Sequence, residues 1–506
     1  MGFLLALMRS QSKNRMINSM TKAAEITPHE PTSFVIFGAT GDLSQRKLLP
    51  ALFKLWRQKL LPPQLIIVSV SRDSLDHATY RTFVHRVVAT ALINEDLSSL
   101  EDFCQLFLYH SGQFEDGQLY LKLSDELIAQ ENSQFGRCTN KLFYLAVPPA
   151  AYATIFQNLA FSGLTIPCGG SAGWTRVIVE KPFGRDLATA QELDRMLGLL
   201  FKEEQIFRVD HYLAKETVQN ILAFRFSNSI FEPLWNNEAI EKVEIRFWEE
   251  QGVGERGAFY EDVGALRDVG QNHLLQMLAL IAMEDPDKIS AGRIRRRRAD
   301  VLKALRPVTE LEATEHTIRA QYDGYRQEAA VSADSNTETY FRLRAFVDND
   351  RWRGVPFYLE SGKRMSESKT EISVHFRERP NTLTQLEGKD HHQNILTFRI
   401  QPDEGISLIF WVKKPGFEAT LEPRLLAFNY TDADHPHIIP DAYERVLHDC
   451  IHGDQTLFTS TEEVSASWQF ITPLLEYWRN TSLVTYRPGS RGLQGHEAPT
   501  EQEIRN

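Results

Sequence analysis

The stretch FVIFGATGDLSQRKLLPALF, residues 34–53, decides the fold of the first part of the chain. Its apolar beginning predicts a strand from Ser33 to Phe37, which ends at Gly38. Gly41 follows three residues later, and leucines at helical spacing come after it. A strand, a glycine turn and a helix start form a dinucleotide-binding arrangement, in which N–H groups at the helix N-terminus face a pyrophosphate.

The same turn also has an ordinary structural explanation. Its spacing is G-x-x-G, whereas the full dinucleotide fingerprint is G-x-G-x-x-G. Asp42 is of a residue type that caps helices, and we expect it to cap this one. On these residues alone, a cofactor turn and a plain glycine turn both remain open.

The second predicted strand, QLIIVSVSR, bears on the choice of cofactor. Ser71 and Arg72 stand where NAD-binding domains usually carry an acidic residue for the ribose hydroxyl. A hydroxyl and a guanidinium suit a 2'-phosphate, so this pair favours NADP. The alternative is an arginine that faces solvent at the end of a strand.

The rhythm of apolar residues divides the chain. From Thr32 to Val209 short apolar runs alternate with helical patterns, and beyond Lys242 the runs are long and alternate apolar with polar residues. We therefore expect an α/β Rossmann-like dinucleotide-binding domain, followed by an α+β domain with a large, mainly antiparallel sheet. The predicted parts are an N-terminal extension (1–31), the NADP-binding domain (32–209), the α+β domain for substrate binding and oligomerisation (210–487) and a tail (488–506).

Composition limits the function. The net charge of -11 argues against a general binder of nucleic acid or anionic membranes. The four cysteines include no C-x-x-C pair, which indicates neither a disulfide framework nor a zinc site and favours a reducing cytoplasm. The apolar start MGFLLALMRS is shorter than a signal-peptide core or a membrane span.

The segment RVDHYLAKETVQN follows a predicted strand. If a helix begins near Leu213, then His211, Tyr212 and Lys215 lie at its positive end and can bind an anion. An ordinary surface histidine and lysine would explain the same residues.

His273 lies near the start of the apolar stretch GALRDVGQNHLLQMLALIAME. Such a histidine is usually structural, unless a carboxylate meets it and stabilises its protonated form; Asp210 is the candidate. In RVIVEKPFG, a cis peptide at Lys181-Pro182 would fix the backbone where cofactor and substrate meet, although a plain turn is the alternative. The run GRIRRRRADVLKALRP, with Arg293 and 295–298, predicts a solvated helix face or an intersubunit salt-bridge patch.

Taken together, the segments from Ser33 to Pro488 resemble the glucose-6-phosphate dehydrogenase family. The resemblance rests on eight stretches in the family's order: GATGDLSQRKLLPALF, LFYLAVPP, EKPFGRDL, DHYLAKETVQN, RDVGQNHLLQMLALIAME, NDRWRGVPFYLESGKRM, QPDEGISL and PDAYERVLHD. It implies that NADP oxidises β-D-glucose 6-phosphate at C1 to 6-phosphoglucono-δ-lactone, the first step of the oxidative pentose phosphate pathway. It further implies a cytoplasmic homodimer or homotetramer that requires no metal.

The resemblance also assigns roles to residues. His273 falls on the catalytic base and Asp210 on its partner carboxylate. The substrate positions that it implies are Lys181, His211, Tyr212, Lys215, Glu249, Asp268, Lys363 and Gln401. The cofactor positions that it implies are Gly38, Ala39, Thr40, Gly41, Asp42, Leu43, Ser44, Gln45, Lys47, Arg72 and Lys181, with Lys47 beside the active site.

One position departs from the family. Five residues after Lys363 the family usually has a second basic residue for the phosphate, and this chain has Ser368. Either Lys369 turns inward, Arg364 substitutes, or the phosphate is held less tightly, and we expect a raised KM.

Two other functions remain to be weighed. One is an oxidoreductase of the glucose-fructose oxidoreductase type, which would share VEKP but would not be expected to carry DHYLAKE and RDVGQNHLLQ. The other is a catalytically silent protein that binds a sugar phosphate or a nucleotide.

Overall fold

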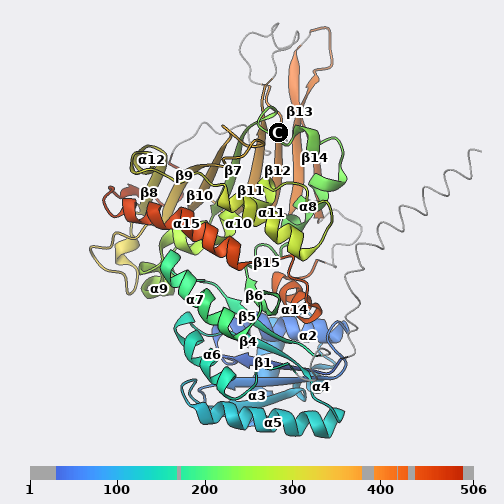
Figure 1. The fold of residues 1–506 in the computed structure, drawn as a ribbon. Coiled ribbons are helices and arrows are strands. Elements are labelled where there is room, and N and C mark those ends of the chain that lie inside the picture. The colour runs from blue at the N-terminus through green and yellow to red at the C-terminus, as the bar shows by residue number, and fades with distance from the viewer. Residues whose placement is uncertain (1–29, 168–172, 379–391, 419, 431–438, 494–506) are drawn as a thin grey trace, which may run out of the picture.

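The computed structural model describes residues 30–167, 173–378, 392–418, 420–430 and 439–493. Within them the chain builds two sheets, one above the other in Figure 1, each with its own helices. A continuous cluster of buried apolar side chains runs through both parts, from β1 and α2 to α10 and α15. The two sheets are therefore packed on one another through a shared core.

The first sheet has seven strands in the order β15-β6-β5-β4-β1-β2-β3. The strands are β1 (Thr32–Phe37), β2 (Leu65–Ser71), β3 (Phe107–Ser111), β4 (Asn140–Leu145), β5 (Thr175–Glu180), β6 (Ile206–Val209) and β15 (Phe458–Thr459). All neighbours are parallel except β15 and β6. The predicted parallel sheet is confirmed, because β1, β2, β4 and β5 are buried along their whole length, as their apolar runs indicate.

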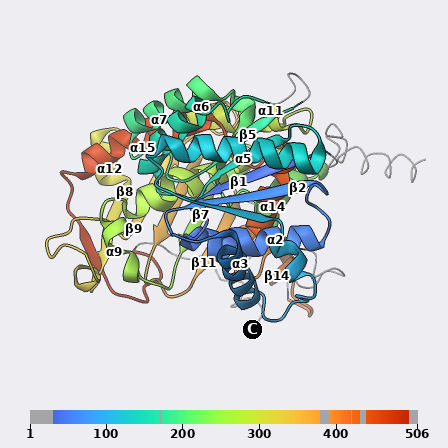
Figure 2. The ribbon, with the colours of Figure 1, turned by 90° about the horizontal axis from the view of Figure 1, so that it is seen from below.

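Helices cover both faces of this sheet. Figure 2 shows α5, α6 and α7 on one side of β1 and β2, with α2 and α3 on the other. The bounds of these elements are η1 (Ser44–Leu48), α2 (Leu49–Arg57), α3 (His77–Ala91), α4 (Leu100–Cys104), α5 (Gly117–Phe135), η2 (Pro149–Ala151), α6 (Tyr152–Phe161), α7 (Leu187–Leu200) and η4 (Glu203–Gln205). The cover on both faces explains why these strands lack the alternation of a half-exposed sheet.

The second sheet has nine strands in the order β14-β13-β12-β11-β7-β10-β9-β8-β16. The strands are β7 (Ile240–Trp248), β8 (Thr317–Tyr322), β9 (Tyr340–Phe346), β10 (Pro356–Gly362), β11 (Lys369–Phe376), β12 (Ile395–Gln401), β13 (Gly405–Lys413), β14 (Leu421–Asn429) and β16 (Val484–Tyr486). Only the β7–β10 and β8–β16 pairs are parallel. The prediction of a large, mainly antiparallel sheet is confirmed.

The helices of the second part gather on one face of its sheet, as Figure 1 shows for α8, α10, α11 and α15. The bounds of the helices in this part of the chain, with the shorter turns, are α8 (Glu216–Ser227), η5 (Glu232–Leu234), η6 (Gly254–Arg256), α9 (Gly257–Glu261), η7 (Leu266–Leu274), α10 (Leu275–Ala282), α11 (Ala291–Lys303), α12 (Glu310–Glu315), η8 (Tyr325–Gln327) and α15 (Thr461–Trp478). Helix α14 (Ala442–His452) packs instead against α2, next to the first sheet (Figure 1). Every residue of α10 is buried, because its sequence LQMLALIA is apolar except for Gln276. In the described part of the chain, no helix combines the length and apolar character that crossing a bilayer requires.

The arginine run differs from its prediction. Arg298 is fully buried, and its Nε lies 2.7 Å from Oε1 of the equally buried Glu463. The same guanidinium donates to the carbonyls of Thr456, shortly before β15, and of Phe458, the first residue of β15. Arg295 is buried as well and pairs with Glu203. These two arginines join α11 to β15 and α15, because a carboxylate and backbone carbonyls satisfy their donors away from water.

Two further features go beyond what the sequence indicated. Residues 488–493, placed in a tail from the sequence, lie along the second sheet: Ser490 pairs with Met365, and the Leu493 N–H donates to the Tyr340 hydroxyl at 3.3 Å. Cys138 is disulfide-bonded, although the spacing of the cysteines indicated no disulfide. Cys104 and Cys450 are free and buried.

The Arg298–Glu463 pair makes a prediction for stability. In Glu463→Gln the buried guanidinium loses its counter-charge, so the free energy of unfolding should fall by about 3 kcal/mol. Asp287→Asn weakens the exposed Asp287–Arg297 pair and should change the free energy of unfolding by less than about 0.5 kcal/mol. Urea unfolding measures both, and equal effects would show that burial of the Arg298–Glu463 pair does not matter.

Candidate active site

The turn after β1 has the geometry of a cofactor cradle. Gly38 has φ +80°, and a Cβ there would lie 2.3 Å from the carbonyl oxygen of Ala146 on the neighbouring strand end. Its N–H donates to Val70 O at 2.8 Å, and the N–H of Gly41 donates back to Gly38 O at 2.9 Å. Only glycine fits this close approach, so the tight turn predicted from the sequence is present.

The helix after the turn begins differently from the prediction. Asp42 does not cap it: this residue lies in the first helical turn, exposed, and its carboxylate pairs with Arg46 at 3.0 Å. A cap must precede the helix, and Asp42 already has helical backbone. Instead, Ser44 Oγ donates to Gly38 O at 2.9 Å and Gln45 Nε2 donates to Thr40 O at 2.7 Å, which fixes the turn against the helix.

Beside the turn, polar side chains fix the end of β2. Thr40 Oγ1 lies 2.5 Å from Asp73 Oδ2 and 2.9 Å from Ser71 Oγ, which in turn contacts the Tyr109 hydroxyl at 2.8 Å. Arg72 lies between these residues in the chain and is exposed. Among the described residues its guanidinium has neither a hydrogen bond nor an ion pair, so it is available to a ligand.

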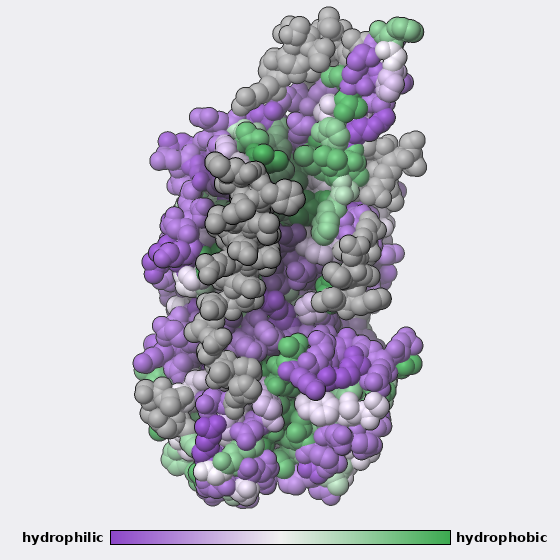
Figure 3. All heavy atoms as spheres, turned by 90° about the vertical axis from the view of Figure 1, so that its right-hand side faces the viewer, coloured by the Kyte–Doolittle hydropathy of each residue, from purple (hydrophilic) through white to green (hydrophobic). Residues whose placement is uncertain are grey.

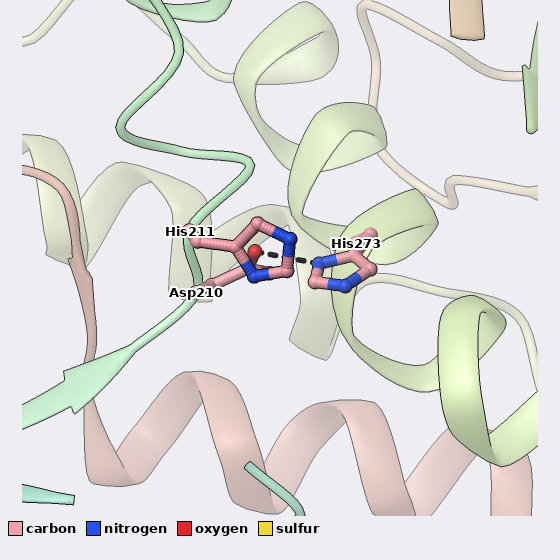
Figure 4. Close-up of side chains that lie close together, drawn as sticks. All are labelled: Asp210, His211 and His273. Atoms are coloured by element: carbon pink, nitrogen blue, oxygen red, sulfur yellow. Dashed lines mark hydrogen bonds and ion pairs between the residues drawn. The ribbon is translucent and has the colours of Figure 1, made fainter. Parts of the chain in front are cut away.

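The structure brings Asp210 and His273 together. Asp210 follows β6 and His273 lies in η7, yet Asp210 Oδ1 and His273 Nδ1 are 2.6 Å apart (Figure 4). Both side chains are only 2% exposed. The carboxylate meets the histidine that the sequence singled out, which is the condition under which that histidine is more than a core residue.

Lys181 occupies the other side of the imidazole. Its Nζ lies 2.9 Å from His273 Nε2 and donates to the carbonyl of Asp268 at 2.8 Å. Because Asp210 can only accept at Nδ1, the hydrogen of the neutral ring belongs on Nδ1, and Nε2 accepts from the lysine. The peptide bond between Lys181 and Pro182 is cis, as the sequence suggested.

The charges around His273 keep it neutral and Asp210 ionised. Burial lowers the pKa of His273 and Lys181 lowers it further, while Asp210 raises it; the net pKa lies below the usual 6.5. Burial raises the pKa of Asp210, but His273, His211 and Lys181 outweigh it and hold that pKa at about 2. At neutral pH the pair is therefore a carboxylate and an imidazole whose Nε2 carries no hydrogen, the form of a general base.

Asp210, His211 and His273 also have the donor types of a metal site, and their ligand atoms lie within 4.8 Å of one another. Nδ1 of His273 is taken by Asp210 and Nε2 by Lys181. Both ring nitrogens of His273 already have a partner, and one of these partners is the amine of Lys181. The arrangement therefore fits proton transfer better than the binding of a metal ion.

A cavity of about 740 Å³ lies next to this pair, and among its lining residues are His211 and Tyr212, whose ring centroids lie 5.0 and 4.5 Å from that of His273. It brings together residues that the sequence assigned to cofactor and to substrate: Asp42, Leu43, Lys47, His211, Tyr212, Lys215 and Gln401. Lys47 reaches Asp441 at 3.4 Å on the opposite wall. Helix α8 begins at Glu216, not near Leu213, so His211 and Tyr212 lie on the preceding turn and Lys215 is the residue before the helix.

The remaining predicted residues form a second group. Lys363 at the end of β10 pairs with Glu249 at 2.5 Å, and the pKa of Asp268 is lowered to about 2, where burial is outweighed by Lys181 and Lys363. Ser368 accepts from the Glu250 N–H at 3.1 Å. The two basic neighbours of this position each face an acidic side chain. Lys369 pairs with Glu371 at 3.0 Å, and Arg364 lies 3.6 Å from Glu328.

Sequence reasoning missed several residues at this site. Glu180, Asp441 and Tyr443 belonged to the quoted stretches EKPFGRDL and PDAYERVLHD but received no role. Glu180 is buried next to Lys181, and Asp441 and Tyr443 line the cavity. The available signal was their place in stretches that carry the resemblance.

The contact between Asp210 and His273 leads to a prediction for the pKa of His273. The pKa of the His273 imidazole should lie below 6.5, and Asp210→Asn should lower it further, since Asp210 is the group that raises it. ¹⁵N NMR of histidine-labelled protein over a range of pH measures both values. An unchanged pKa in the variant would show that Asp210 does not act on the ring.

Comparison with known proteins agrees with this geometry. The family model described as "Glucose-6-phosphate dehydrogenase, NAD binding domain" matches residues 35–220, and "Glucose-6-phosphate dehydrogenase, C-terminal domain" matches residues 222–505. The chain is 40% identical over 494 residues to glucose-6-phosphate 1-dehydrogenase of Chlamydia pneumoniae, covering 94% of this chain and 96% of that one.

Two more relatives extend the likeness. The cytoplasmic isoform of glucose-6-phosphate 1-dehydrogenase from Solanum tuberosum is 36% identical over 466 residues, with 91% of this chain and 89% of the relative covered. A solved structure of glucose-6-phosphate dehydrogenase in complex with its substrate glucose-6-phosphate superposes with a TM-score of 0.85 at 34% identity, over 92% of this chain and 96% of that chain. The chain belongs to the glucose-6-phosphate dehydrogenase family.

Proposed function

We propose that this protein is a glucose-6-phosphate 1-dehydrogenase that oxidises β-D-glucose 6-phosphate at C1 with NADP. The products are 6-phosphoglucono-δ-lactone and NADPH, in the first step of the oxidative pentose phosphate pathway. The observation that carries the proposal is the Asp210–His273 pair, buried beside Lys181 and next to His211 and Tyr212, which line a cavity together with Asp42 and Leu43. The solved relative with its bound substrate supports the choice of sugar phosphate.

His273 is the base in this proposal. In the structure Nε2 accepts from Lys181, so the C1 hydroxyl of the substrate would take the place of the lysine and give its proton to Nε2. Asp210 stabilises the imidazolium that results and holds Nδ1 in orientation. Bound nicotinamide supplies the acceptor for the hydride that leaves C1.

Cationic and hydroxyl groups would hold the substrate. We assign the phosphate to His211, Tyr212 and Lys215, at the positive end of α8, where donors and the helix dipole favour an anion. The sugar hydroxyls are assigned to Lys181, Glu249, Asp268, Lys363 and Gln401. Binding energy from the phosphate, remote from C1, orients the reacting carbon against Nε2.

The cofactor would lie over the glycine turn. The pyrophosphate is assigned to the backbone from Gly38 to Gln45, and the 2'-phosphate to the exposed guanidinium of Arg72. Lys47 points across the cavity to Asp441 and is placed beside the nicotinamide end. This assignment makes NADP the preferred cofactor over NAD.

The proposal includes a cytoplasmic homodimer or homotetramer. A relative described as a cytoplasmic isoform supports the location. Apolar side chains are exposed on β14, where Leu426 is 58% and Phe428 45% exposed, and Figure 3 shows apolar surface gathered on the upper part of this face. Exposed apolar surface on a sheet face supports contact between copies of the chain.

The two alternatives fit less well. An oxidoreductase of the glucose-fructose oxidoreductase type does not account for family models that match both parts of the chain. A silent binding protein has no use for a buried, correctly charged histidine and aspartate pair.

Loss of the base should abolish turnover with little effect on binding. His273→Asn should lower kcat by roughly two to four orders of magnitude, because general-base removal costs that much. NADPH formation at 340 nm and calorimetric binding of glucose 6-phosphate measure the two effects, and His316→Asn, at a partly exposed histidine outside the cavity, is the control. A mild fall of kcat would exclude His273 as the base; no NADPH from the unmutated protein would exclude the proposed reaction.

Arg72 should decide cofactor preference. Arg72→Ala removes the partner of the 2'-phosphate and should raise KM for NADP about tenfold or more, while KM for NAD stays unchanged. Arg86→Ala, at an exposed arginine of α3, should change neither value. Equal losses with NADP and NAD would assign Arg72 another role.

Ser368 should weaken the hold on the substrate phosphate. Ser368→Lys supplies the missing cation and should lower KM for glucose 6-phosphate several-fold at constant kcat, on the order of one charge-assisted hydrogen bond. Glu367→Gln, which changes the net charge by the same amount one residue earlier, is the control for general electrostatics. An unchanged KM in Ser368→Lys would argue against this explanation.

A further inference from the structure

Glu180 is a buried carboxyl group that the mechanism above does not use. It is the last residue of β5, only 9% exposed, and precedes Lys181. The Tyr144 hydroxyl on β4 donates to Glu180 Oε1 at 2.5 Å, and the Tyr443 hydroxyl is hydrogen-bonded to the same carboxyl. One side chain therefore joins β4, β5 and α14 at the point where Lys181 leaves the sheet for His273.

Tyr443 connects this buried group to the cavity. It is the second residue of α14, and its ring lies nearly parallel to that of His211, with centroids 6.1 Å apart and planes at 21°. Lys47 Nζ lies 5.9 Å from the same ring. Asp441 accepts from the Tyr443 N–H at 2.9 Å and meets Lys47 at 3.4 Å. The first turn of α14 thus touches one residue assigned to the phosphate and one assigned to the cofactor.

We propose that Glu180 and Tyr443 are a positioning pair for this active site, in which the tyrosine hydroxyl bound to Glu180 holds the first turn of α14 against His211 and Lys181. The pair rests on the proposed function for its effect on turnover. Neither residue touches the reacting atoms: Glu180 acts through Lys181 and Asp210, and Tyr443 through His211 and Lys47.

The ionisation of Glu180 distinguishes a positioning role of this pair from a purely structural one. The groups that face it are Tyr144 on β4, Tyr152 on α6, Tyr443 and Cys450 on α14, Lys181 directly after β5 and Asp210 after β6. Burial raises the pKa of Glu180 to about 7, although Tyr144, Tyr443 and Lys181 lower it. The pKa of Tyr144 and that of Tyr443 are raised above the usual value by burial, so both stay protonated as donors.

The two pKa values separate the effects of Glu180 and His273. His273 titrates below 6.5, where Glu180, with a pKa of about 7, is already protonated, so the charge of Glu180 does not set the pKa of His273. Above pH 7 Glu180 ionises beside Lys181 and Asp210, which gives the site a second ionisation. Tyr443→Phe removes a donor to the ionised carboxyl and moves this ionisation to higher pH, whereas Glu180→Gln removes it.

The test compares Tyr443→Phe, Glu180→Gln and the double variant with the unmutated protein. We expect Tyr443→Phe to lower kcat about tenfold, the loss that one buried hydrogen bond to a charged group can cause, with KM for glucose 6-phosphate within about twofold. The acidic limb set by His273 should stay in place, while an ionisation near pH 7 should move to higher pH in Tyr443→Phe and be absent in Glu180→Gln and in the double variant. Tyr120→Phe, which removes another buried tyrosine hydroxyl far from the cavity, should change neither kcat nor this ionisation.

Two readouts keep this inference separate from the proposed function. If the unmutated protein forms no NADPH from glucose 6-phosphate, the proposed function fails, and the ¹⁵N resonances of His211 and His273 near pH 7 still decide whether the ionisation of Glu180 acts on the site. Lower melting temperatures with unchanged kcat, pH profile and histidine resonances would overturn the proposal. Tyr443→Phe decides the matter even if Glu180→Gln does not fold, since it keeps the ring beside His211.

Discussion

A hydrogen bond of 2.6 Å between two side chains that are each 2% exposed is the constraint on which the active site depends. A carboxylate at this depth stays ionised only if donors and cations surround it. Asp210 obtains them from separate places: His273 from η7, Lys181 as the nearby cation, and the Tyr212 N–H at 3.0 Å from the following turn. The ends of β5 and β6 must therefore keep a fixed position relative to η7.

The two sheets contribute different halves of this arrangement. The parallel sheet supplies Lys181 and Asp210 from the carboxyl ends of adjacent strands, where ligands of such sheets bind. The antiparallel sheet and its buried helix supply His273 and Lys363. Since one apolar core runs through both, the geometry of the site is set by the packing between the sheets and not by either sheet alone.

Local features of this fold could be predicted from the sequence. The turn at Gly38, the buried strands and the alternation in the second sheet depend on neighbouring residues, whose patterns are visible in the letters. Helix starts were less certain: α8 begins at Glu216 and not near Leu213, because a turn with its own hydrogen bonds intervenes. The pairing of Asp210 with His273 was only a candidate, since contact between residues so far apart depends on packing.

The errors concerned contacts over long distances in the chain. The residues next to Arg298 in the sequence do not distinguish a buried arginine from a solvated one. They therefore did not indicate that Arg298 pairs with Glu463 in the core. The same holds for Glu180 and Tyr443, which belong to different helices and strands. Such contacts depend on the complete fold. A single sequence, read without an alignment, contains no direct signal for them.

The short strand β15 has a consequence for how the protein is made. It pairs Phe458 with Val209, so the first sheet receives its last strand from a part of the chain synthesised more than two hundred residues later. On the ribosome, β6 emerges as an open sheet edge and stays one until nearly the whole chain has left the exit tunnel. For much of its synthesis, the nascent protein therefore exposes unpaired backbone groups of β6, to which another strand could bind. We expect chaperones to protect this edge until β15 pairs with it.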